Sequence, residues 1–421
     1  FGLTIDFIFA GDKFEERLAT EMSSGELPDL VCFTNRKQAE TAVQANLLLD
    51  LDPLLAEYGQ DLSANMPAML QFMRDNLSGG SGKLYGLTNY VGSQTMTDAI
   101  HLALYTRWDL YKQVGAPQVD TYEELLPVFR QMQDLEPEND KGQKNYTFTL
   151  WADWDANEMA MANWTIVNYR GVNNSQDNGT LAFTEYNQET KQLKSMFDPD
   201  STYLQTIRFY FKANQMGLLD PDSVTQKFDN VLNKLNDGRL LTAYWGWMAA
   251  TFNGSPLVEA NPLAGMIPVF PKKEARLFLS PNSPVGREFV WSVGAKTQYA
   301  DRIVSLLNFA ATARGAAELM NGVEGTDWSI VDGKAQFLGD NLEKFVTNDP
   351  TVKYIGMYEP MCLMSPWNVD PRTGEPINRT CWSQVIRRNL RESEKQWAEA
   401  NGVQNAFDFA SKNLVTVQHD A

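Results

Sequence analysis

Tryptophans stand beside glycine or carboxylate residues at two places in the sequence. Trp245-Gly246-Trp247 follows the apolar stretch 240–244, and Trp151-Ala152-Asp153-Trp154-Asp155 follows the strand-like stretch 147–150. Indole rings stack on the C–H faces of pyranose rings, and carboxylate oxygens accept hydrogen bonds from sugar hydroxyls. Such a site needs neither a nucleophile nor a metal. Both places therefore predict non-catalytic binding of a carbohydrate.

The pair Trp245 and Trp247 is the centre of this prediction. A single tryptophan is more often a core residue, but two indoles that flank a glycine at a strand end are suited to line a cleft. We place Trp247 in the cleft. If the segment stays extended, the Trp245 and Trp247 side chains lie on the same face, and if the chain turns sharply at Gly246, the two indoles separate.

Two other function classes remain open. Asp153 and Asp155 could be the paired carboxylates of a glycoside hydrolase. The acidic composition also fits a receptor for a peptide or a polyamine. We favour a binding protein over an enzyme because the chain has only two histidines, His101 and His419, and lacks a catalytic constellation of titratable groups.

Length and charge limit the possible partners. At 421 residues, two lobes are expected, and the 36 basic against 53 acidic residues give a net charge of −17. This charge argues against nucleic acid as a partner. Three cysteines, Cys32, Cys362 and Cys381, show no CxxC spacing, so we expect no zinc site; a Cys362–Cys381 pair and two separate buried thiols both remain possible.

The segment 228–247 must position the two indoles. Phe228, Val231, Leu232 and Leu235 recur at helical spacing, so 228–235 should form a helix with one apolar face. Asn236-Asp237-Gly238 should end this helix, because glycine adopts the left-handed conformation at little cost. The stretch 240–244 then predicts a short strand that leads into the tryptophans.

Further polar and aromatic residues follow other predicted strands. Residues 1–9 and 30–33 read as strands on either side of a helix, which predicts a β-α-β unit with parallel strands. Asn35 and Arg36 follow the second strand, where ligands usually bind. Other candidate ligand contacts follow turns or strands elsewhere: Tyr90, Arg287, Trp291 and Trp328.

The remaining features concern metals and membranes. The acidic loop 136–142 resembles a calcium loop, but its glycine falls one place late and Lys141 lies inside it, so we expect a surface turn and no metal or cofactor. No run of eighteen apolar residues occurs. The chain opens on a strand pattern without a leader, from which we expect that preceding residues are missing.

Five motifs in a fixed order resemble family 1 extracellular solute-binding proteins, the lipoprotein-anchored receptors that deliver sugars to ABC importers. The resemblance covers nearly the whole chain and rests on Ser24-Gly25-Glu26-Leu27-Pro28-Asp29, Lys83-Leu84-Tyr85-Gly86-Leu87, Leu104-Tyr105-x-Arg107-x-Asp109 with Thr121-Tyr122-Glu123-Glu124-Leu125, Asn236-Asp237-Gly238 before Trp245, and Gly322-Val323-Glu324-Gly325-Thr326-Asp327-Trp328. The last motif and the long C-terminal half resemble the oligosaccharide-binding branch of the LipO group and the alginate receptors. Trp247 matches the position of a sugar-stacking aromatic residue.

The resemblance implies an α/β protein with a type II periplasmic-binding fold. Each of two lobes would hold a mixed, mainly parallel sheet flanked by helices, with the ligand cleft between them and closure by hinge rotation. We expect residues 1–104 and 268–323 in one lobe, and 105–267 and 324–421 in the other. The family's lipid-modified cysteine, first strand and first helix have no counterpart here. We expect a monomeric extracellular receptor, lipid-anchored in its bacterial precursor, that passes a carbohydrate to a membrane permease.

Overall fold

The computed structural model of the chain contains two compact units. Unit 1 comprises Phe1–Thr97, Pro281–Asn389 and Ala421, and unit 2 comprises Asp98–Ser280 and Leu390–Asp420. The structure describes residues 2, 4–8, 13–92, 100, 102–152, 169–177, 180–279, 283–287, 289–347, 349–353, 355–356, 361–382, 384–385 and 390–418. Both units combine helices and strands, which confirms the predicted α/β class with two lobes.

The unit boundaries differ from the predicted lobe boundaries. The chain passes between the units near residues 97, 280 and 389, whereas the sequence suggested 104, 267 and 323. The largest difference is the segment 324–389, which belongs to unit 1. Its residues Trp328 and Trp382 share a buried cluster with Tyr90 and Ala316. This shared core explains why the segment packs with the N-terminal part of the chain.

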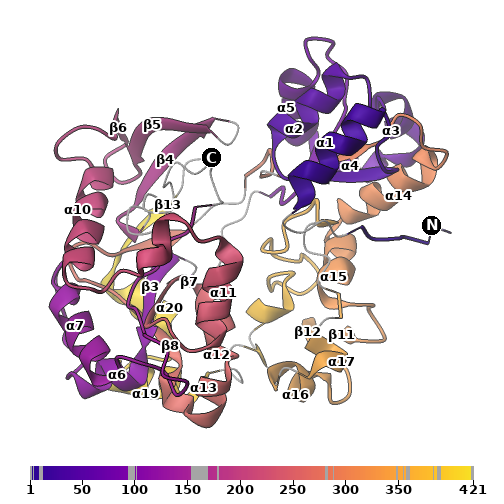
Figure 1. Cartoon of the computed structure of the whole chain (residues 1–421). Helices are drawn as coiled ribbons and strands as arrows, with labels where there is room; N and C mark the ends of the chain where they lie inside the picture. The colour runs from indigo at the N-terminus through magenta and orange to yellow at the C-terminus, as the bar shows by residue number, and fades with distance from the viewer. Residues whose placement is uncertain are drawn as a thin grey trace. The chain divides into compact units, whose positions relative to one another are not determined.

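Unit 1 consists mainly of helices around a small sheet. Its helices are α1 (Phe14–Ser24), α2 (Arg36–Gln44), α3 (Asp52–Tyr58), α4 (Gln60–Asn65), α5 (Pro67–Leu77), α14 (Ala300–Ala310), α15 (Ala313–Asn321), α16 (Asn341–Val346), α17 (Pro350–Lys353) and the 3-10 helix η6 (Arg379–Cys381). Its strands are β1 (Leu30–Phe33), β2 (Leu87–Thr88), β10 (Val290–Val293), β11 (Trp328–Val331) and β12 (Lys334–Phe337). Figure 1 shows α14 beside α3 and α4 at one end of this unit.

The three-stranded sheet of unit 1 has the order β1-β10-β2, and both pairings are antiparallel; β11 and β12 form a separate antiparallel pair. The predicted parallel β-α-β unit is therefore wrong at its first strand: residues 4–8 form no strand, and β1 pairs with β10, about 260 residues further along the chain. Ile5, Phe7 and Ile8 are exposed. Local alternation of apolar residues predicted a strand here, but such a pattern does not indicate which strand the segment would pair with.

Unit 2 has more strands. They are β3 (Leu102–Arg107), β4 (Val172–Asp177), β5 (Thr180–Asn187), β6 (Gln192–Ser195), β7 (Thr242–Trp245), β8 (Met266–Val269), β9 (Arg276–Leu279) and β13 (Val415–Gln418). The helices are α6 (Trp108–Gln113), α7 (Leu125–Leu135), α10 (Thr202–Gln215), α11 (Phe228–Asn236), α12 (Gly246–Asn253), α13 (Pro256–Ala260), α19 (Glu392–Asn401), α20 (Ala406–Asn413) and the 3-10 helices η3 (Pro221–Val224) and η4 (Pro262–Ala264).

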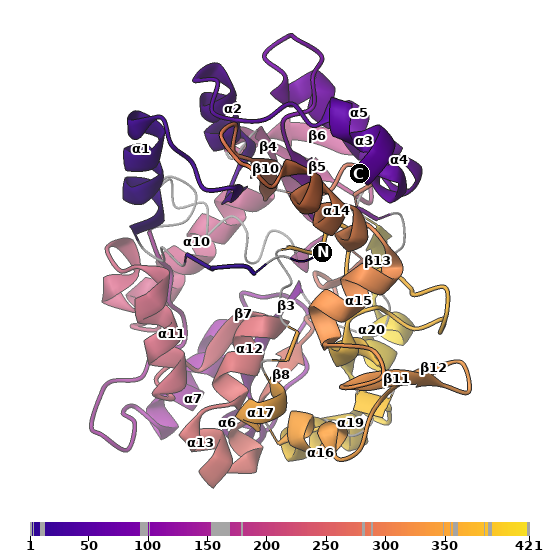
Figure 2. The ribbon, with the colours of Figure 1, turned by 90° about the vertical axis from the view of Figure 1, so that its right-hand side faces the viewer.

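The central sheet of unit 2 has the order β7-β3-β8, with β3 antiparallel to both neighbours. Figures 1 and 2 show these strands side by side, and Figure 1 shows α6 and α7 on one side of them and α11 and α12 on the other. Parallel pairing occurs between β9 and β13 and at the bridges from 146 to 240 and from 148 to 219. The described strands of unit 2 thus pair in both directions but mostly antiparallel, whereas mainly parallel sheets were predicted.

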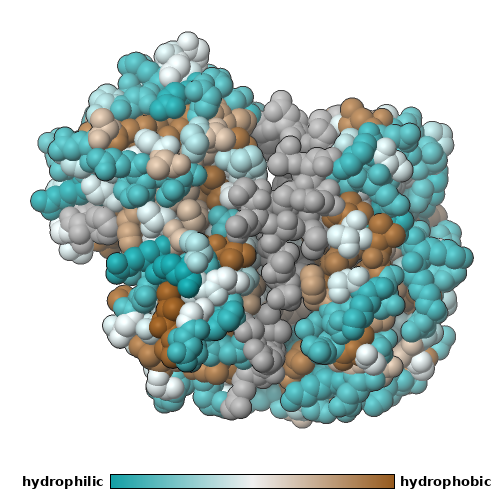
Figure 3. Space-filling view, turned by 180° about the vertical axis from the view of Figure 1, so that it is seen from behind, coloured by the Kyte–Doolittle hydropathy of each residue, from teal (hydrophilic) through white to brown (hydrophobic). Residues whose placement is uncertain are grey.

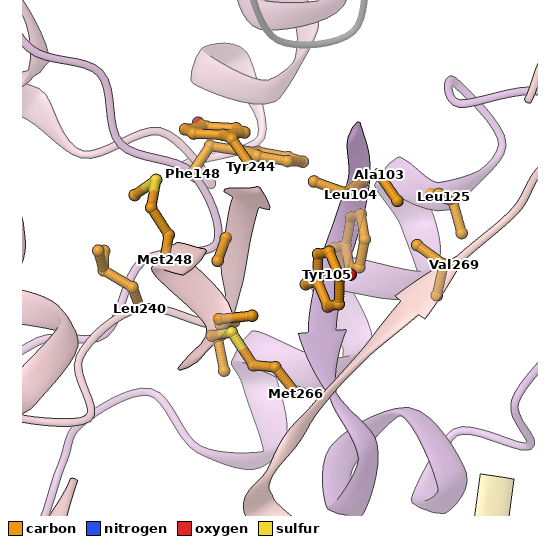
Figure 4. Close-up of a cluster of buried hydrophobic side chains, with 14 of the residues drawn as sticks. Ala103, Leu104, Tyr105, Leu125, Phe148, Leu240, Tyr244, Met248, Met266 and Val269 are labelled. Atoms are coloured by element: carbon orange, nitrogen blue, oxygen red, sulfur yellow. The ribbon is translucent and has the colours of Figure 1, made fainter. Parts of the chain in front are cut away.

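A large hydrophobic core lies around β3 of unit 2. Figure 4 shows how β3, β7, β8, α7 and α12 contribute Leu104, Tyr244, Met266, Leu125 and Met248 to it. Figure 3 shows polar residues over most of one face of the molecule, with separate hydrophobic patches among them. None of the described helices is long and apolar enough to cross a membrane.

Candidate functional site

The predicted helix, stop and strand before the tryptophans are all present. α11 ends at Asn236, Gly238 has a φ of 69°, and β7 ends at Trp245. The chain then enters α12 at Gly246, so Trp247 lies in a first helical turn and not in a strand. A Cβ atom on residue 246 would lie 2.7 Å from the Ile100 carbonyl oxygen, so only glycine allows this close approach of two backbone segments.

The turn at Gly246 keeps the two indoles together. The rings of Trp245 and Trp247 are stacked, with centroids 5.7 Å apart and planes 9° apart. Trp245 is buried, with 6% of its surface exposed, whereas Trp247 is 43% exposed. Trp247 therefore presents an accessible aromatic ring, and the buried ring of Trp245 stacks against it.

Other aromatic rings hold this pair in place. Phe228, at the start of α11, lies 5.5 Å from the Trp247 ring, and Trp151 packs against Phe228 at 4.9 Å and against Trp245 at 6.0 Å. We call Trp151, Phe228, Tyr244, Trp245 and Trp247 the tryptophan cluster. Trp151 is 2% exposed, so it supports the cluster and presents no surface of its own. Phe228 was recognised in the sequence only as a helix-face residue.

A buried polar network fixes the segments that carry Trp151 and Phe228. Lys234 Nζ donates to Asp220 Oδ2 at 2.6 Å and to Gln226 Oε1 at 2.8 Å. Gln226 Nε2 donates to the Leu150 carbonyl at 2.7 Å, and the Ala152 N–H donates to the Gln226 carbonyl at 3.0 Å. The network thus ties both neighbours of Trp151 to the turn before α11.

The other predicted residues of this region, Asp153 and Trp154, lie outside the described residues.

In unit 1, the sheet topology brings several predicted residues to one edge. β1 and β2 both run antiparallel to β10, so their carboxyl ends meet where β10 begins. Asn35 and Arg36 follow β1, Tyr90 lies two residues after β2, and Arg287 lies shortly before β10. Four residues from three distant segments of the sequence therefore lie at one end of the sheet, although the predicted parallel pairing was wrong.

Asn35 and Arg36 have structural partners at this edge. Asn35 is the N-cap of α2, and its Oδ1 accepts the Gln38 N–H at 3.0 Å. Arg36 Nε lies 3.3 Å from Glu40 Oε1, and its guanidinium lies over the Phe72 ring. Both side chains help to fix the start of α2, which explains their type at these positions without a ligand.

Tyr90 and Arg287 form a second aromatic group with Trp367. The Arg287 guanidinium carbon is 6.0 Å from the Tyr90 ring centroid and 5.6 Å from that of Trp367, and the two rings meet edge to face at 5.3 Å. Arg287 is exposed, whereas Tyr90 is mostly buried. Sequence reasoning missed Trp367, because no spacing connects it to Tyr90.

Two predicted contacts are core residues in the structure. Trp291 lies in β10, is 8% exposed and packs within the main core of unit 1. Trp328 is 1% exposed, its Nε1 donates to the Gly322 carbonyl at 2.8 Å, and its ring packs against Trp382. Because it is enclosed by protein, Trp328 presents no surface to a ligand, and the prediction for this residue is corrected.

The acidic loop 136–142 is held together by its own side chains. Asn139 Oδ1 accepts the backbone N–H groups of Lys141 and Gln143, and Lys141 Nζ donates to Asp237 Oδ1 at 2.7 Å. Within the described part of the chain, no group of three or more His, Cys, Asp or Glu residues could hold a metal ion. Cys362 and Cys381 are buried and are not joined by a disulfide, and the Cys362 thiol donates to the Ala316 carbonyl at 3.8 Å.

No protein-family model matches the chain, and no curated protein matches it in sequence. Solved structures do resemble it. The alginate-binding protein AlgQ2 has 16% identity and a TM-score of 0.54, over 94% of this chain and 75% of that one. An HMO-binding solute-binding protein associated with an ABC transporter of Bifidobacterium longum infantis has 18% identity and a TM-score of 0.53, over 93% and 75%.

A third similar structure is the ABC-transporter substrate-binding protein FusA of S. pneumoniae in complex with kestose, with 11% identity, a TM-score of 0.58, and coverage of 90% of this chain and 74% of that one. All three similarities extend over at least nine-tenths of this chain. The chain therefore has the fold of the solute-binding proteins of ABC transporters.

Proposed function

We propose that this protein is the non-catalytic substrate-binding component of an ABC importer and that it captures an oligosaccharide. The observation that carries the proposal is the exposed indole of Trp247, stacked on the buried indole of Trp245. A sugar ring can cover such a plate and displace water from it, while the buried partner keeps the plate in place before binding.

The similar structures support the ligand class. They are described as binding alginate, HMO or kestose, all of them carbohydrates. The proposal includes an extracellular location, a lipid anchor in the precursor, a monomeric state and a membrane permease as the partner that receives the sugar. A micromolar dissociation constant corresponds to about −8.2 kcal/mol, which a few stacked rings and hydroxyl hydrogen bonds can supply.

The predicted hydrolase pair, Asp153 and Asp155, lies outside the described residues, and Glu394, a described carboxylate with a raised pKa, has structural contacts. Burial raises the pKa of the Glu394 carboxyl, as a general acid would require, but Glu394 Oε2 accepts the Arg391 N–H at 2.8 Å and caps α19. Arg391 and Glu394 are both half-buried, and their opposite charges attract each other. Glu394 therefore has a structural role that accounts for its environment.

The test is the substitution Trp247→Ala, measured with an oligosaccharide that the unmodified protein binds. We expect affinity to fall by about 1 to 3 kcal/mol, the range found for stacking on aromatic side chains, with little change in melting temperature. Phe211→Ala is the matched control, because Phe211 is an exposed aromatic residue of the same unit, 60% exposed on α10. Its affinity should not change.

A Trp247→Ala protein that keeps its affinity but loses several kcal/mol of stability would return Trp247 to a purely structural role. Equal losses of affinity in Trp247→Ala and Phe211→Ala would also contradict the proposal, since the effect would then not be specific to the tryptophan cluster.

A further inference from the structure

Asn89, the first residue after β2, carries a buried amide that makes no hydrogen bond. Its side chain is 0% exposed, and neither Nδ2 nor Oδ1 has a partner in the part of the chain that the structure describes. An amide offers two donor hydrogens and an acceptor oxygen, and leaving them unpaired away from water is unfavourable. Such a group is rare in native proteins and calls for an explanation, such as a functional role or an internal water.

The backbone around Asn89 is firmly held. Its N–H donates to the Phe289 carbonyl at 3.2 Å, and its carbonyl accepts the Arg287 N–H at 2.9 Å. A Cβ atom at residue 286 would lie 2.6 Å from the Asn89 carbonyl oxygen, so Gly286 is required for this approach. The lack of partners for the amide is therefore not a result of a loosely placed backbone.

Unfavourable backbone geometry also marks this position. Tyr90, the next residue, has a φ of 58°, in the left-handed region that an aromatic residue rarely adopts. Strain of this kind persists where the surrounding structure enforces it, and it gathers at binding sites. Asn89 thus combines an unpaired buried amide with a strained neighbour at the sheet edge that also carries Asn35, Arg36 and Arg287.

We propose that the Asn89 amide binds hydroxyl groups of the carbohydrate ligand; this inference rests on the proposed function. A hydroxyl both donates and accepts, and a neutral amide does the same, so the two groups can pair in either direction. Because the amide is covered, neighbouring side chains must move to admit the sugar.

The experiment compares Asn89→Leu with the unmodified chain, using an oligosaccharide that the unmodified protein binds. Leucine has nearly the shape of asparagine but no polar atoms. We expect affinity to fall at least about tenfold, and the melting temperature to stay the same or rise because an unpaired polar group is removed. Affinities are compared well below both melting temperatures.

Ser292→Ala is the matched control. The Ser292 hydroxyl in β10 is also buried, and no described residue bonds to it. Trp291 pairs with Leu87, so Asn89 shares the face of Leu87 and Trp291, whereas Ser292 points to the opposite face. This substitution should keep the melting temperature the same or raise it, and it should leave affinity unchanged.

The outcomes distinguish a sugar-binding role of the Asn89 amide from a purely structural one. Unchanged affinity in Asn89→Leu, with or without a lower melting temperature, overturns the inference and indicates that the amide serves the folded protein itself, for example through an internal water. If Asn89→Leu fails to fold, Asn89→Ala is judged by the same loss of affinity. If the unmodified protein binds no glycan, the proposed function fails first, and this inference fails with it.

Discussion

Trp247 differs from three other tryptophans of this chain in the surface that it presents. It is 43% exposed, whereas Trp245, Trp151 and Trp328 are 6%, 2% and 1% exposed. An indole can bind a sugar only if part of its surface faces solvent before the sugar arrives. We therefore propose that Trp247 contacts the sugar and that Trp245 and Trp151 support it from behind.

Trp328 provides the contrasting case. Trp328→Ala should lower the free energy of unfolding by about 3 to 5 kcal/mol, because it removes a buried indole that packs against Trp382, and it should leave sugar affinity unchanged. Chemical denaturation and calorimetric titration measure the two quantities. Trp328→Phe is the control that keeps most of the packing. A loss of affinity at unchanged stability would return Trp328 to the binding site.

The sequence could not separate these tryptophans, because burial depends on residues that are far away in the chain. Trp328 and Trp382 are 54 positions apart, and nothing local indicates that they meet. Trp245 and Trp247 were the easier case, since only the angle at Gly246 was open. The chain does turn there, into α12, yet the rings remain stacked.

At the scale of elements, the polar network around Lys234 positions the tryptophan cluster. Lys234→Met removes the ammonium that bonds Asp220 and Gln226, and so loosens the hold of Gln226 on the backbone at Leu150 and Ala152. We expect weaker sugar binding, by up to about tenfold, together with a loss of stability, because buried carboxylate Asp220 is left without its cation.

Lys234→Arg tests whether the network depends on the positive charge of residue 234. It keeps the charge, so it should recover part of the affinity and part of the melting temperature together. Trp328→Ala, which destabilises unit 1, should leave affinity unchanged. If Lys234→Met bound sugar as tightly as the unmodified protein, the network would have no part in positioning the cluster.

Local elements were predictable where the sequence itself encodes their limits. The end of α11 at Asn236 and the strand that follows it are examples, because glycine and apolar spacing are local signals. Strand partners were not predictable. β1 pairs with β10, and β10 comes after the whole unit 2 segment Asp98–Ser280 in the sequence. No local signal near β1 could indicate this partner.

The boundaries of the units, like the strand partners, depend on contacts between distant segments and were not predictable. Residues 324–389 join unit 1 because their side chains complete a core with Tyr90 and α15, and no composition change in the sequence marks that choice.

The net charge of −17 of the whole molecule should affect the binding of a neutral sugar and of a cationic ligand differently. A neutral sugar gains nothing from this charge, whereas a polyamine or a basic peptide would be attracted by it. Salt screens such attraction beyond about 10 Å at 0.1 M ionic strength and beyond about 3 Å at 1 M. Salt dependence therefore reports on the ligand class without a structure of the complex.

The most direct test of non-catalytic oligosaccharide binding is calorimetric titration of the full chain with a panel of neutral oligosaccharides at low and high salt. Each mixture is then analysed by chromatography after incubation. We predict saturable binding of at least one oligosaccharide, the same affinity at both salt concentrations, and intact sugar at the end. Cleaved sugar would establish a hydrolase, and salt-sensitive binding of polyamines or peptides in place of sugars would establish a receptor for cationic ligands; either result would contradict the proposed function.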